Sequence, residues 1–379
     1  MTEEKAEKVP LKEQALNADR ITRIGREVQA VQPDFDTAGF AREVLADFPR
    51  LELKARIART SQALRDHLPG TGTQALDVLL RSLPPTPEAA GATSDFGLHI
   101  YSPHSDYVAR YCRTAPELEH ALEALRRLTT YFSAEDAVRY FIKEFPDETM
   151  KAVDTWARDP DHRVRRLASE ATRPKLPWSP RIPLPIDAAL PVLDQLYTDS
   201  SRFVTRSVAN HLHDITNDNP DLVLATLQGW KNAGRAQGKE FDFIARKALR
   251  TRLKKGWAPG YEFLGYPSDA PVELSSVLLE NSELTDGDTL AFAADLTSRV
   301  PTPLHVTYVI SSTSRRGAPR EKVYFLTKAT TEPGRTMHLT KQHPLRSTAN
   351  TKITPGTYAI AIQVNGRRLS HAHFQVVER

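Results

Sequence analysis

The sequence contains one cysteine, Cys112, and no long uninterrupted apolar run. A single cysteine excludes disulfides within the chain and a metal cage built from several thiolates. A chain without disulfides suits a reducing compartment. No stretch approaches the roughly 20 apolar residues of a membrane-spanning helix, and the charged N-terminal residues lack the apolar core of a secretory signal. We therefore expect a cytoplasmic protein that does not contact a membrane.

The chain also lacks a large excess of charge of either sign. It has 51 Lys and Arg against 47 Asp and Glu, for a formal net charge of +4. A charge this small is only a weak indication of a polyanionic partner. With 379 residues, 40% of them hydrophobic, the chain can bury more than one core. We therefore expect two or three folded domains.

Residues 11–257 form a succession of short amphipathic segments that end at Pro, Asp-Pro or Gly. The expected helices are Leu11–Ile24, Thr37–Phe48, Leu51–His67, Gly72–Leu83, Tyr101–Arg113, Glu117–Tyr131, Ala134–Phe145, Glu148–Arg158, His162–Arg173, Ile186–Thr198, Arg202–Thr216, Asp221–Ala233 and Phe241–Lys255. The segment Arg173–Pro185 carries five prolines, so we expect an ordered or extended loop there.

A repeat links three of these helices. The segments 164–170, 204–210 and 244–250 match one another at a spacing of 40 residues. A period near 40 built of helix pairs is typical of a HEAT-type solenoid, whose concave face is lined by the same position of each repeat. The register makes Arg166, Arg206 and Arg246 equivalent. The sequence therefore predicts a row of arginines along one inner surface.

From about Val272 the pattern changes to alternating apolar and polar residues, with about seven short strands. This pattern is typical of an immunoglobulin-like sandwich, and the run Pro355–Tyr358 fits a tyrosine corner. Without a cysteine pair, packing alone would hold the two sheets together. We expect a multidomain protein: disordered residues 1–10, an all-α HEAT-like repeat solenoid over 11–257, a linker over 258–270 and an all-β immunoglobulin-like sandwich over 271–379.

The helix His162–Arg173 places a glutamate among arginines. At about 100° per residue, Arg163, Arg166, Glu170 and Arg173 fall within an arc of roughly 80°. One interpretation is a surface salt bridge between Arg166 and Glu170, which are four residues apart and suit a pair worth a few tenths of a kcal/mol. The other is that the arginines hold a polyanion, and Glu170 then needs a positive partner of its own.

The helix Phe241–Lys255 carries six cations in ten residues. They could form a soluble end-cap, but together with the arginine row they favour a track for DNA phosphates. Contacts of this kind position a duplex without reading its sequence. The candidate phosphate ligands are Arg166, Arg173, Arg206, Arg246, Arg250 and Lys255.

Three acids are expected to converge on this track: Glu170, Asp214 and Glu135. Asp214 could instead be an ordinary residue near a helix end. Glu135 could instead stabilise the N-terminus of its helix, with Ser133 as the N-cap. A carboxylate near a phosphate track suits a positive species, either a cationic damaged base or the oxocarbenium-like sugar formed as a glycosidic bond breaks.

Aromatic residues near the acids are candidate DNA contacts, because an aromatic face attracts a cation. They are Tyr131, Phe132 and Trp178; the alternative for Trp178 is a packing anchor. His162, His211 and His213 lack a credible metal spacing with a third ligand, so we expect no metal and no other cofactor.

At these residues the chain resembles the bacterial alkylpurine DNA glycosylases built from HEAT-like repeats, specifically the AlkC branch with a C-terminal immunoglobulin-like domain. The resembling segments are Leu128–Ile142, His162–Trp178, Asn210–Ile215 and the N-terminal Leu11–Asn17. Asp136, Tyr140 and Ala171 stand where the family pattern has an aromatic residue, a proline and a glycine.

The resemblance implies excision of cationic bases such as 3-methyladenine from double-stranded DNA, without flipping the base into a deep pocket. It also implies that Glu170 and Asp214 stabilise charge or position water, that Glu135 assists, and that Arg166 and Arg173 hold the flanking phosphates. Arg315 and Arg316, in a loop of the sandwich, are interpreted as part of a DNA clamp. We expect a monomer that acts in base excision repair.

Two other functions remain open. A non-enzymatic DNA-binding protein would keep the arginine row but would need no acids on it. A solenoid scaffold would bind an acidic protein in its concave face and would show little salt-sensitive affinity for DNA. The fold alone cannot decide between them.

Overall fold

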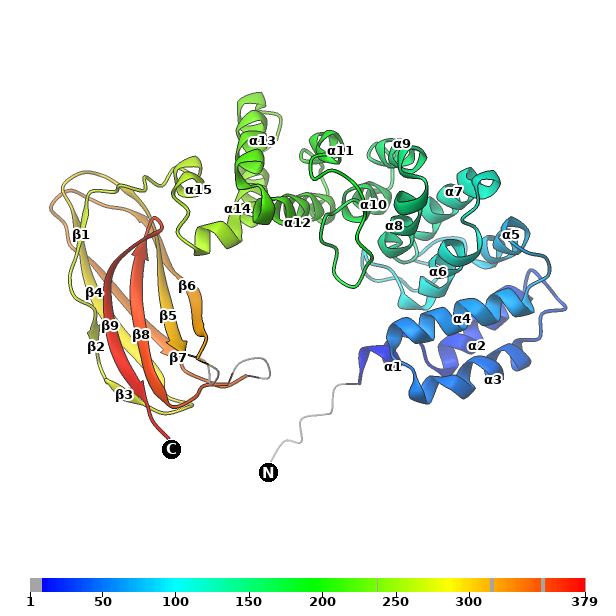
Figure 1. The fold of residues 1–379 in the computed structure, drawn as a ribbon, viewed down its shortest axis with the longest axis horizontal. Coiled ribbons are helices and arrows are strands. Elements are labelled where there is room, and N and C mark those ends of the chain that lie inside the picture. Colours follow the sequence, from blue (N-terminus) through cyan, green and yellow to red (C-terminus); the bar gives the residue numbers. More distant parts are fainter. Residues whose placement is uncertain (1–8, 237, 314–316, 349–351, 379) are drawn as a thin grey trace. The chain divides into compact units, whose positions relative to one another are not determined.

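The structure is a computed structural model that describes residues 9–236, 238–313, 317–348 and 352–378. The chain divides into two compact units (Figure 1). One comprises the chain up to Ile215 together with Ala233–Ile244, and the other comprises Thr216–Asn232 and the chain from Ala245 onward. The boundaries fall inside α12 and α14 and before the last residue of α13, and not in the segment 258–270 that the sequence suggested as a linker.

The first unit is helical. Its helices are α1 (Leu11–Ala15), α2 (Ala18–Gln29), α3 (Thr37–Asp47), α4 (Leu53–His67), α5 (Thr73–Ser82), α6 (Ser102–Tyr111), α7 (Leu118–Leu128), α8 (Glu135–Glu144), α9 (Pro146–Trp156), α10 (His162–Ala171), α11 (Leu190–Leu196) and most of α12 (Arg202–Asp218). Short 3₁₀ turns occur at Phe48–Arg50, His99–Tyr101 and Ala115–Glu117. The second unit contains α13 (Pro220–Ala233) except its last residue, most of α14 (Gly238–Lys254) and α15 (Ala258–Phe263).

The predicted helix 11–24 is in fact two helices, α1 and α2. Leu16 is extended, and the Asn17 side chain accepts a hydrogen bond from the backbone N–H of Arg20 at 3.0 Å, which starts a new helix. Asparagine competes for backbone hydrogen bonds in this way and favours caps over helix interiors. The prediction missed this break because the apolar spacing continues through it. The remaining predicted helices are present, with ends that shift by a few residues.

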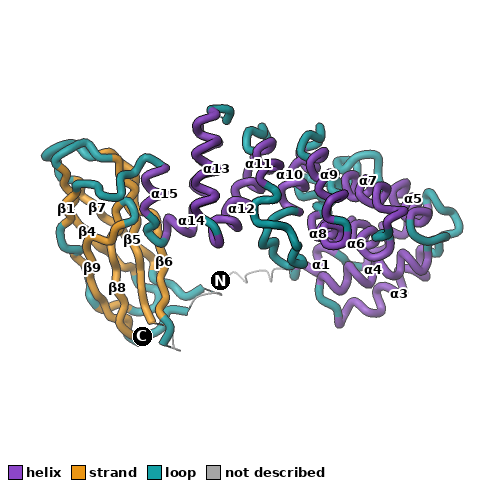
Figure 2. Tube along the Cα trace, turned by 45° about the horizontal axis from the view of Figure 1, so that its top comes forward, coloured by secondary structure: helices purple, strands orange, loops and turns teal. Residues whose placement is uncertain are grey.

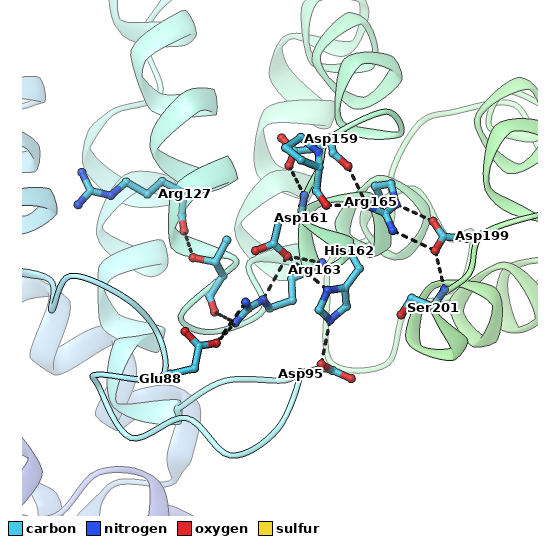
Figure 3. Close-up of polar contacts among 12 residues, drawn as sticks. Glu88, Asp95, Arg127, Asp159, Asp161, His162, Arg163, Arg165, Asp199 and Ser201 are labelled. Carbon is cyan, nitrogen blue, oxygen red and sulfur yellow. Dashed lines mark hydrogen bonds and ion pairs between the residues drawn. The ribbon is translucent and has the colours of Figure 1, made fainter.

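The 40-residue repeat is visible in the turns that precede α10 and α12. Asp159 Oδ1 accepts from the backbone N–H of Asp161 at 2.8 Å, and Asp199 Oδ1 accepts from Ser201 N–H at 2.8 Å in the next repeat. Arg165 of α10 then donates to both carboxylate oxygens of Asp199, at 2.6 and 3.0 Å (Figure 3). Neighbouring repeats are therefore joined by a partly buried ion pair as well as by apolar packing.

The C-terminal part of the second unit is a sandwich of two sheets (Figure 2). One sheet has the order β1-β4-β2 with β7 also paired to β4, and the other has the order β3-β9-β8-β5-β6. The strands are β1 (Val272–Leu274), β2 (Leu278–Leu279), β3 (Glu283–Leu284), β4 (Thr289–Ser298), β5 (Pro303–Thr313), β6 (Pro319–Thr330), β7 (Met337–Pro344), β8 (Gly356–Val364) and β9 (Arg367–Val376). The core lies between the sheets and includes Leu290, Val306, Ile360 and Phe374.

The tyrosine corner is confirmed: the Tyr358 hydroxyl donates to the carbonyl of Thr354, four residues upstream, at 3.0 Å. The described part of the sandwich has nine strands where about seven were expected, because residues 272–284 form the three short strands β1, β2 and β3.

The segment 258–270 packs against its own unit. It contains α15, whose Tyr261 is buried and donates its hydroxyl to the Leu253 carbonyl at 3.0 Å. Gly256, with φ +76°, ends the preceding helix, and a side chain there would strike the Gly366 carbonyl. Within the residues described, no helix combines the length and apolarity needed to cross a bilayer.

Candidate active site

The three predicted acids lie in one chain of ion pairs in the first unit. Arg166 Nη1 is 3.3 Å from Glu135 Oε2, and Arg166 Nη2 is 3.6 Å from Glu170 Oε2. Arg173 joins the other end: its Nη1 donates to Glu170 Oε1 at 2.6 Å, and its Nε and Nη2 donate to the two oxygens of Asp214 at 2.9 and 3.2 Å. The order is therefore Glu135, Arg166, Glu170, Arg173 and Asp214, with Glu170 in the middle.

This arrangement follows from where the residues lie in the helices. Glu135 begins α8, while Arg166 and Glu170 are one turn apart on α10. Arg173 follows the end of α10, and Asp214 belongs to α12 of the next repeat. Two neighbouring repeats and the preceding helix thus contribute to one cluster. Ser133 does not cap α8 as expected; its hydroxyl donates to Glu135 instead.

A second layer of polar groups from α12 holds Glu170. The Ser207 hydroxyl lies 2.6 Å from Glu170 Oε2 and 2.9 Å from the Ser169 hydroxyl. Since a hydroxyl has one proton, Ser207 donates to the carboxylate and accepts from Ser169. His211 Nδ1 lies 3.0 Å from the Ser169 carbonyl, so this nitrogen carries the proton. Full burial lowers the pKa of His211 to about 4, so the ring is neutral.

The two innermost acids have pKa values displaced in opposite directions. Burial by itself would raise the pKa of Glu170, but the positive charges of Arg166 and Arg173 and the hydrogen bond from Ser207 outweigh it and lower the pKa. Burial raises the pKa of Asp214, and Arg173 only partly opposes it. Two carboxylates with such different environments are typical of sites that divide chemical roles between them.

The net charge of the cluster decides what it can bind. Three carboxylates and two guanidiniums give a formal net charge of −1. Both arginines and the two innermost acids are buried, so solvent screens this charge weakly. The cluster is therefore suited to a cation rather than to a phosphate.

This geometry differs from the prediction that Arg166 and Arg173 hold DNA phosphates. Both side chains are buried and already bind carboxylates. Arg206, at the position equivalent to Arg166, is exposed, as is Arg246 in the third repeat. The register of the repeat was correct, but the three arginines do not share one environment. Arg250 is half-buried and Lys255 is exposed.

Sequence reasoning missed two aromatic residues at the site, Phe96 and Phe203. The Arg166 guanidinium lies 5.2 Å from the centroid of Phe96 and 4.9 Å from that of Phe203, and the two rings pack edge-on against each other. The chain can bring Phe96 here because Gly97, with φ +74°, lies against the Tyr131 carbonyl, where a side chain would clash. The sequence signal was an aromatic residue next to a glycine in a loop, which alone is weak.

The predicted aromatic contacts have different environments. Tyr131 is buried, and its hydroxyl donates to the Pro84 carbonyl at 2.5 Å, so it packs in the core. Phe132 packs on His99, with ring centroids 4.6 Å apart. Trp178 is 89% exposed, so it is not a packing anchor. Its φ of +67° is unusual for a side-chain-bearing residue.

The proline-rich loop that carries Trp178 is held by two cations. Lys54 donates to the Trp178 carbonyl and lies 3.3 Å from Asp136. Arg139, fully buried, donates to the carbonyls of Ala171 and Arg173 at 2.9 and 2.7 Å, and to the Pro180 carbonyl at 2.7 Å. Because Arg139 ties the end of α10 to the loop, it fixes the point from which Arg173 reaches the acids.

Arg315 and Arg316 lie outside the described residues. Within the described ranges, no group of three or more His, Cys, Asp or Glu side chains is arranged to hold a metal ion.

The comparisons with known proteins together cover nearly all of the chain. A family model described as "Uncharacterised protein YhaZ, C-terminal Ig-like domain" matches residues 273–378. Uncharacterized protein YhaZ of Bacillus subtilis (strain 168) is 29% identical over 364 residues, which span 95% of this chain and 98% of that protein. The solved structure of Pseudomonas fluorescens alkylpurine DNA glycosylase AlkC, bound to DNA containing an abasic site analog, aligns with a TM-score of 0.85 and 32% identity over 97% of this chain and 99% of that one. The predicted fold class, a helical repeat followed by an immunoglobulin-like sandwich, is confirmed.

Proposed function

The chain belongs to the AlkC family of alkylpurine DNA glycosylases, and we propose that it excises cationic N-alkylated bases of the 3-methyladenine type from double-stranded DNA. The reaction is hydrolysis of the N-glycosidic bond, with water as the nucleophile and no covalent intermediate on the protein. The damaged base is released without entering a deep pocket. This reaction initiates base excision repair.

The observation that carries the proposal is the buried, net negative cluster centred on Glu170. An N3-alkylated adenine bears a positive charge and leaves as a neutral base, so no general acid is needed. Positive charge then develops on the sugar as the bond breaks. A preorganised carboxylate in a poorly solvated site stabilises that charge at the transition state.

The acids divide the work according to their environments. Glu170 has a lowered pKa and two guanidinium partners, so it stays ionised and stabilises the sugar cation. Asp214 has a raised pKa, which makes its carboxylate the better proton acceptor for the attacking water. Glu135, less buried and paired with Arg166, adds to the negative potential. Arg166 and Arg173 serve as positioning residues for the acids.

DNA is held by other groups. We assign phosphate contacts to exposed cations, Arg206, Arg246 and Lys255, with the half-buried Arg250. Trp178, exposed on its loop, contacts the opened lesion site, and Phe132 is assigned a supporting contact. The sandwich closes on the duplex as a clamp. Backbone contacts of this kind give affinity that falls with salt and is independent of sequence.

The test uses a duplex with a single 3-methyladenine. Base release by the wild type and by Glu170→Gln is compared under single-turnover conditions, after both have been shown to bind the duplex equally. The amide keeps the shape and the hydrogen bond from Ser207 but removes the charge, so release is expected to fall about 100- to 1,000-fold. Ser275→Ala, in the second unit, is the control for substitution at a polar site.

Each other outcome has a definite meaning. Equal release by both proteins would keep the activity and move the catalytic role to Asp214 or Glu135. DNA binding with no release by the wild type would identify a non-enzymatic DNA-binding protein. No salt-sensitive DNA binding at all would favour a scaffold for an acidic protein.

A further inference from the structure

The second unit contains a pocket apart from the acid cluster, which belongs to the first unit. Its volume is about 210 Å³, and it is formed by the last turns of α14, the segment around α15 and strands β5 and β6 of the five-stranded sheet. All of its lining residues belong to the second unit. Pockets that enclose drug-sized ligands measure roughly 300–1,000 Å³, so this one suits a single ring system.

Aromatic rings form the floor of the pocket. His305 of β5 is the central ring: its centroid is 5.7 Å from Tyr261, 5.5 Å from Tyr266 and 5.6 Å from Phe325. Phe325 lies on β6, an edge strand, and is 56% exposed. The outer face of an antiparallel sheet is ordinarily polar, so an exposed aromatic cluster there indicates a contact surface.

Cations surround the rings. Arg246, Arg250 and Lys254 line the pocket from α14, and Lys328 lines it from β6. Lys328 Nζ is 5.8 Å from the Tyr266 ring centroid, and Lys328 pairs with His305 across the strands. None of the described lining residues is acidic. Burial and the charges of Lys328 and Arg246 lower the pKa of His305 to about 4, so it presents a neutral ring.

The contrast with the acid cluster identifies the class of ligand. Four cations line this pocket, and the described lining residues include no carboxylate, so the pocket attracts an anion. Its aromatic floor favours a flat ring, because bases stack on aromatic side chains and arginines and lysines bind phosphates. A nucleotide supplies both features in one small molecule.

We propose that this pocket binds a single nucleotide, with its base against Phe325 and His305 and its phosphate near Lys328 and Lys254. The nucleotide comes either from an unpaired end or extruded position of a bound DNA strand or from free solution. The site goes beyond the proposed excision reaction: it lies in the other unit, and its test reads binding rather than base release.

The experiment uses two ligands that distinguish the sources. Free dAMP and deoxyadenosine are titrated by calorimetry, and an undamaged duplex with a single-stranded overhang carrying 2-aminopurine is followed by fluorescence, which falls when the base stacks. The variants are Phe325→Ala and Lys328→Gln. The matched controls are Leu278→Ala and Lys341→Gln, an exposed apolar residue and an exposed lysine on the other sheet.

We expect dAMP to bind more tightly than deoxyadenosine, Phe325→Ala to weaken binding at least fivefold, and Lys328→Gln to weaken it about threefold. The controls should bind as the wild type does. If the 2-aminopurine fluorescence of the overhang falls with the wild type but not with Phe325→Ala, the site binds a DNA strand. If dAMP binds and this fluorescence does not fall, the site binds a free nucleotide.

Three results would overturn the proposal: no binding of either ligand by the wild type, equal affinity for dAMP and deoxyadenosine, or equal effects of Phe325→Ala and Leu278→Ala. Because Phe325 is mostly exposed, its removal leaves the fold intact, and thermal unfolding of each variant checks this. If nucleotide binding fails while 3-methyladenine is still released, the proposal for the pocket fails and the proposed function stands.

Discussion

Helices α10 and α12 carry the same repeat motif and use it differently. Arg166 of α10 is buried beside two aromatic rings and is paired with Glu135 and Glu170. Arg206, its equivalent on α12, is exposed. An arginine in the first environment organises a negative site, and one in the second can meet phosphate. The comparison shows that residue type and register do not define a functional role until the partners are known.

The most direct way to break this comparison is to remove each arginine in turn. Arg166→Met removes the guanidinium that is paired with Glu135 and one of the two guanidiniums that are paired with Glu170. Breaking a buried pair of this kind costs about 3–5 kcal/mol. Arg206→Met at an exposed site should change the free energy of unfolding by less than about 0.5 kcal/mol. Urea denaturation of the two variants measures both values.

DNA affinity should show the opposite order. Arg206→Met is expected to weaken binding and to reduce the salt slope by about 1, whereas Arg166→Met should leave that slope unchanged while base release falls. Fluorescence anisotropy at several salt concentrations gives the slopes. Equal stability losses, or a smaller salt slope for Arg166→Met, would contradict the assignment of the two environments.

A second prediction separates the two inner acids by pH. Because the pKa of Asp214 is raised, its carboxylate takes up a proton as the pH falls before Glu170 does, and base release should decrease there. The folded state holds that proton more tightly than the unfolded chain, so this step does not cost stability. The pKa of Glu170 is lower in the folded protein than in the unfolded chain. Its ionised carboxylate therefore stabilises the fold at any pH above the pKa of the unfolded chain, and this stabilisation is lost as the pH falls through the pKa of the folded protein.

Activity should therefore decline at a higher pH than the fold does. Single-turnover release and circular dichroism between about pH 4 and pH 7 measure the two curves. Asp214→Asn should lower release about 100-fold and remove the acidic limb of the profile. An acidic limb that persists in this variant would place the titrating group elsewhere.

The smallest effect is expected at Trp178. Its side chain is 89% exposed, so Trp178→Ala should change the free energy of unfolding by less than about 0.5 kcal/mol. Loss of a stacking surface should weaken binding to a duplex with an abasic-site analogue about fivefold. Leu11→Ala, an exposed apolar change elsewhere on the same unit, is the control. Unchanged affinity would contradict the proposed contact between Trp178 and DNA.

The spacing of apolar residues predicted the helices and strands, because this spacing reflects which face of each element is buried. The repeat of 40 residues, the tyrosine corner at Tyr358 and the grouping of Glu135, Glu170 and Asp214 were all accessible in this way. The break at Asn17 was not, because a cap depends on one side-chain hydrogen bond rather than on a pattern.

The sequence by itself determined two domain types, the repeat register and the acids that lie on it. Only the tertiary structure decided whether the net charge of each site is negative or positive. It folded Phe96 over Arg166 from a distant loop, brought Asp214 to Arg173, and left the exposed Phe325 among cations. These contacts join residues far apart in the chain. The charge of a site is a sum over such neighbours, and it depends on how deeply they are buried, which a linear sequence does not state.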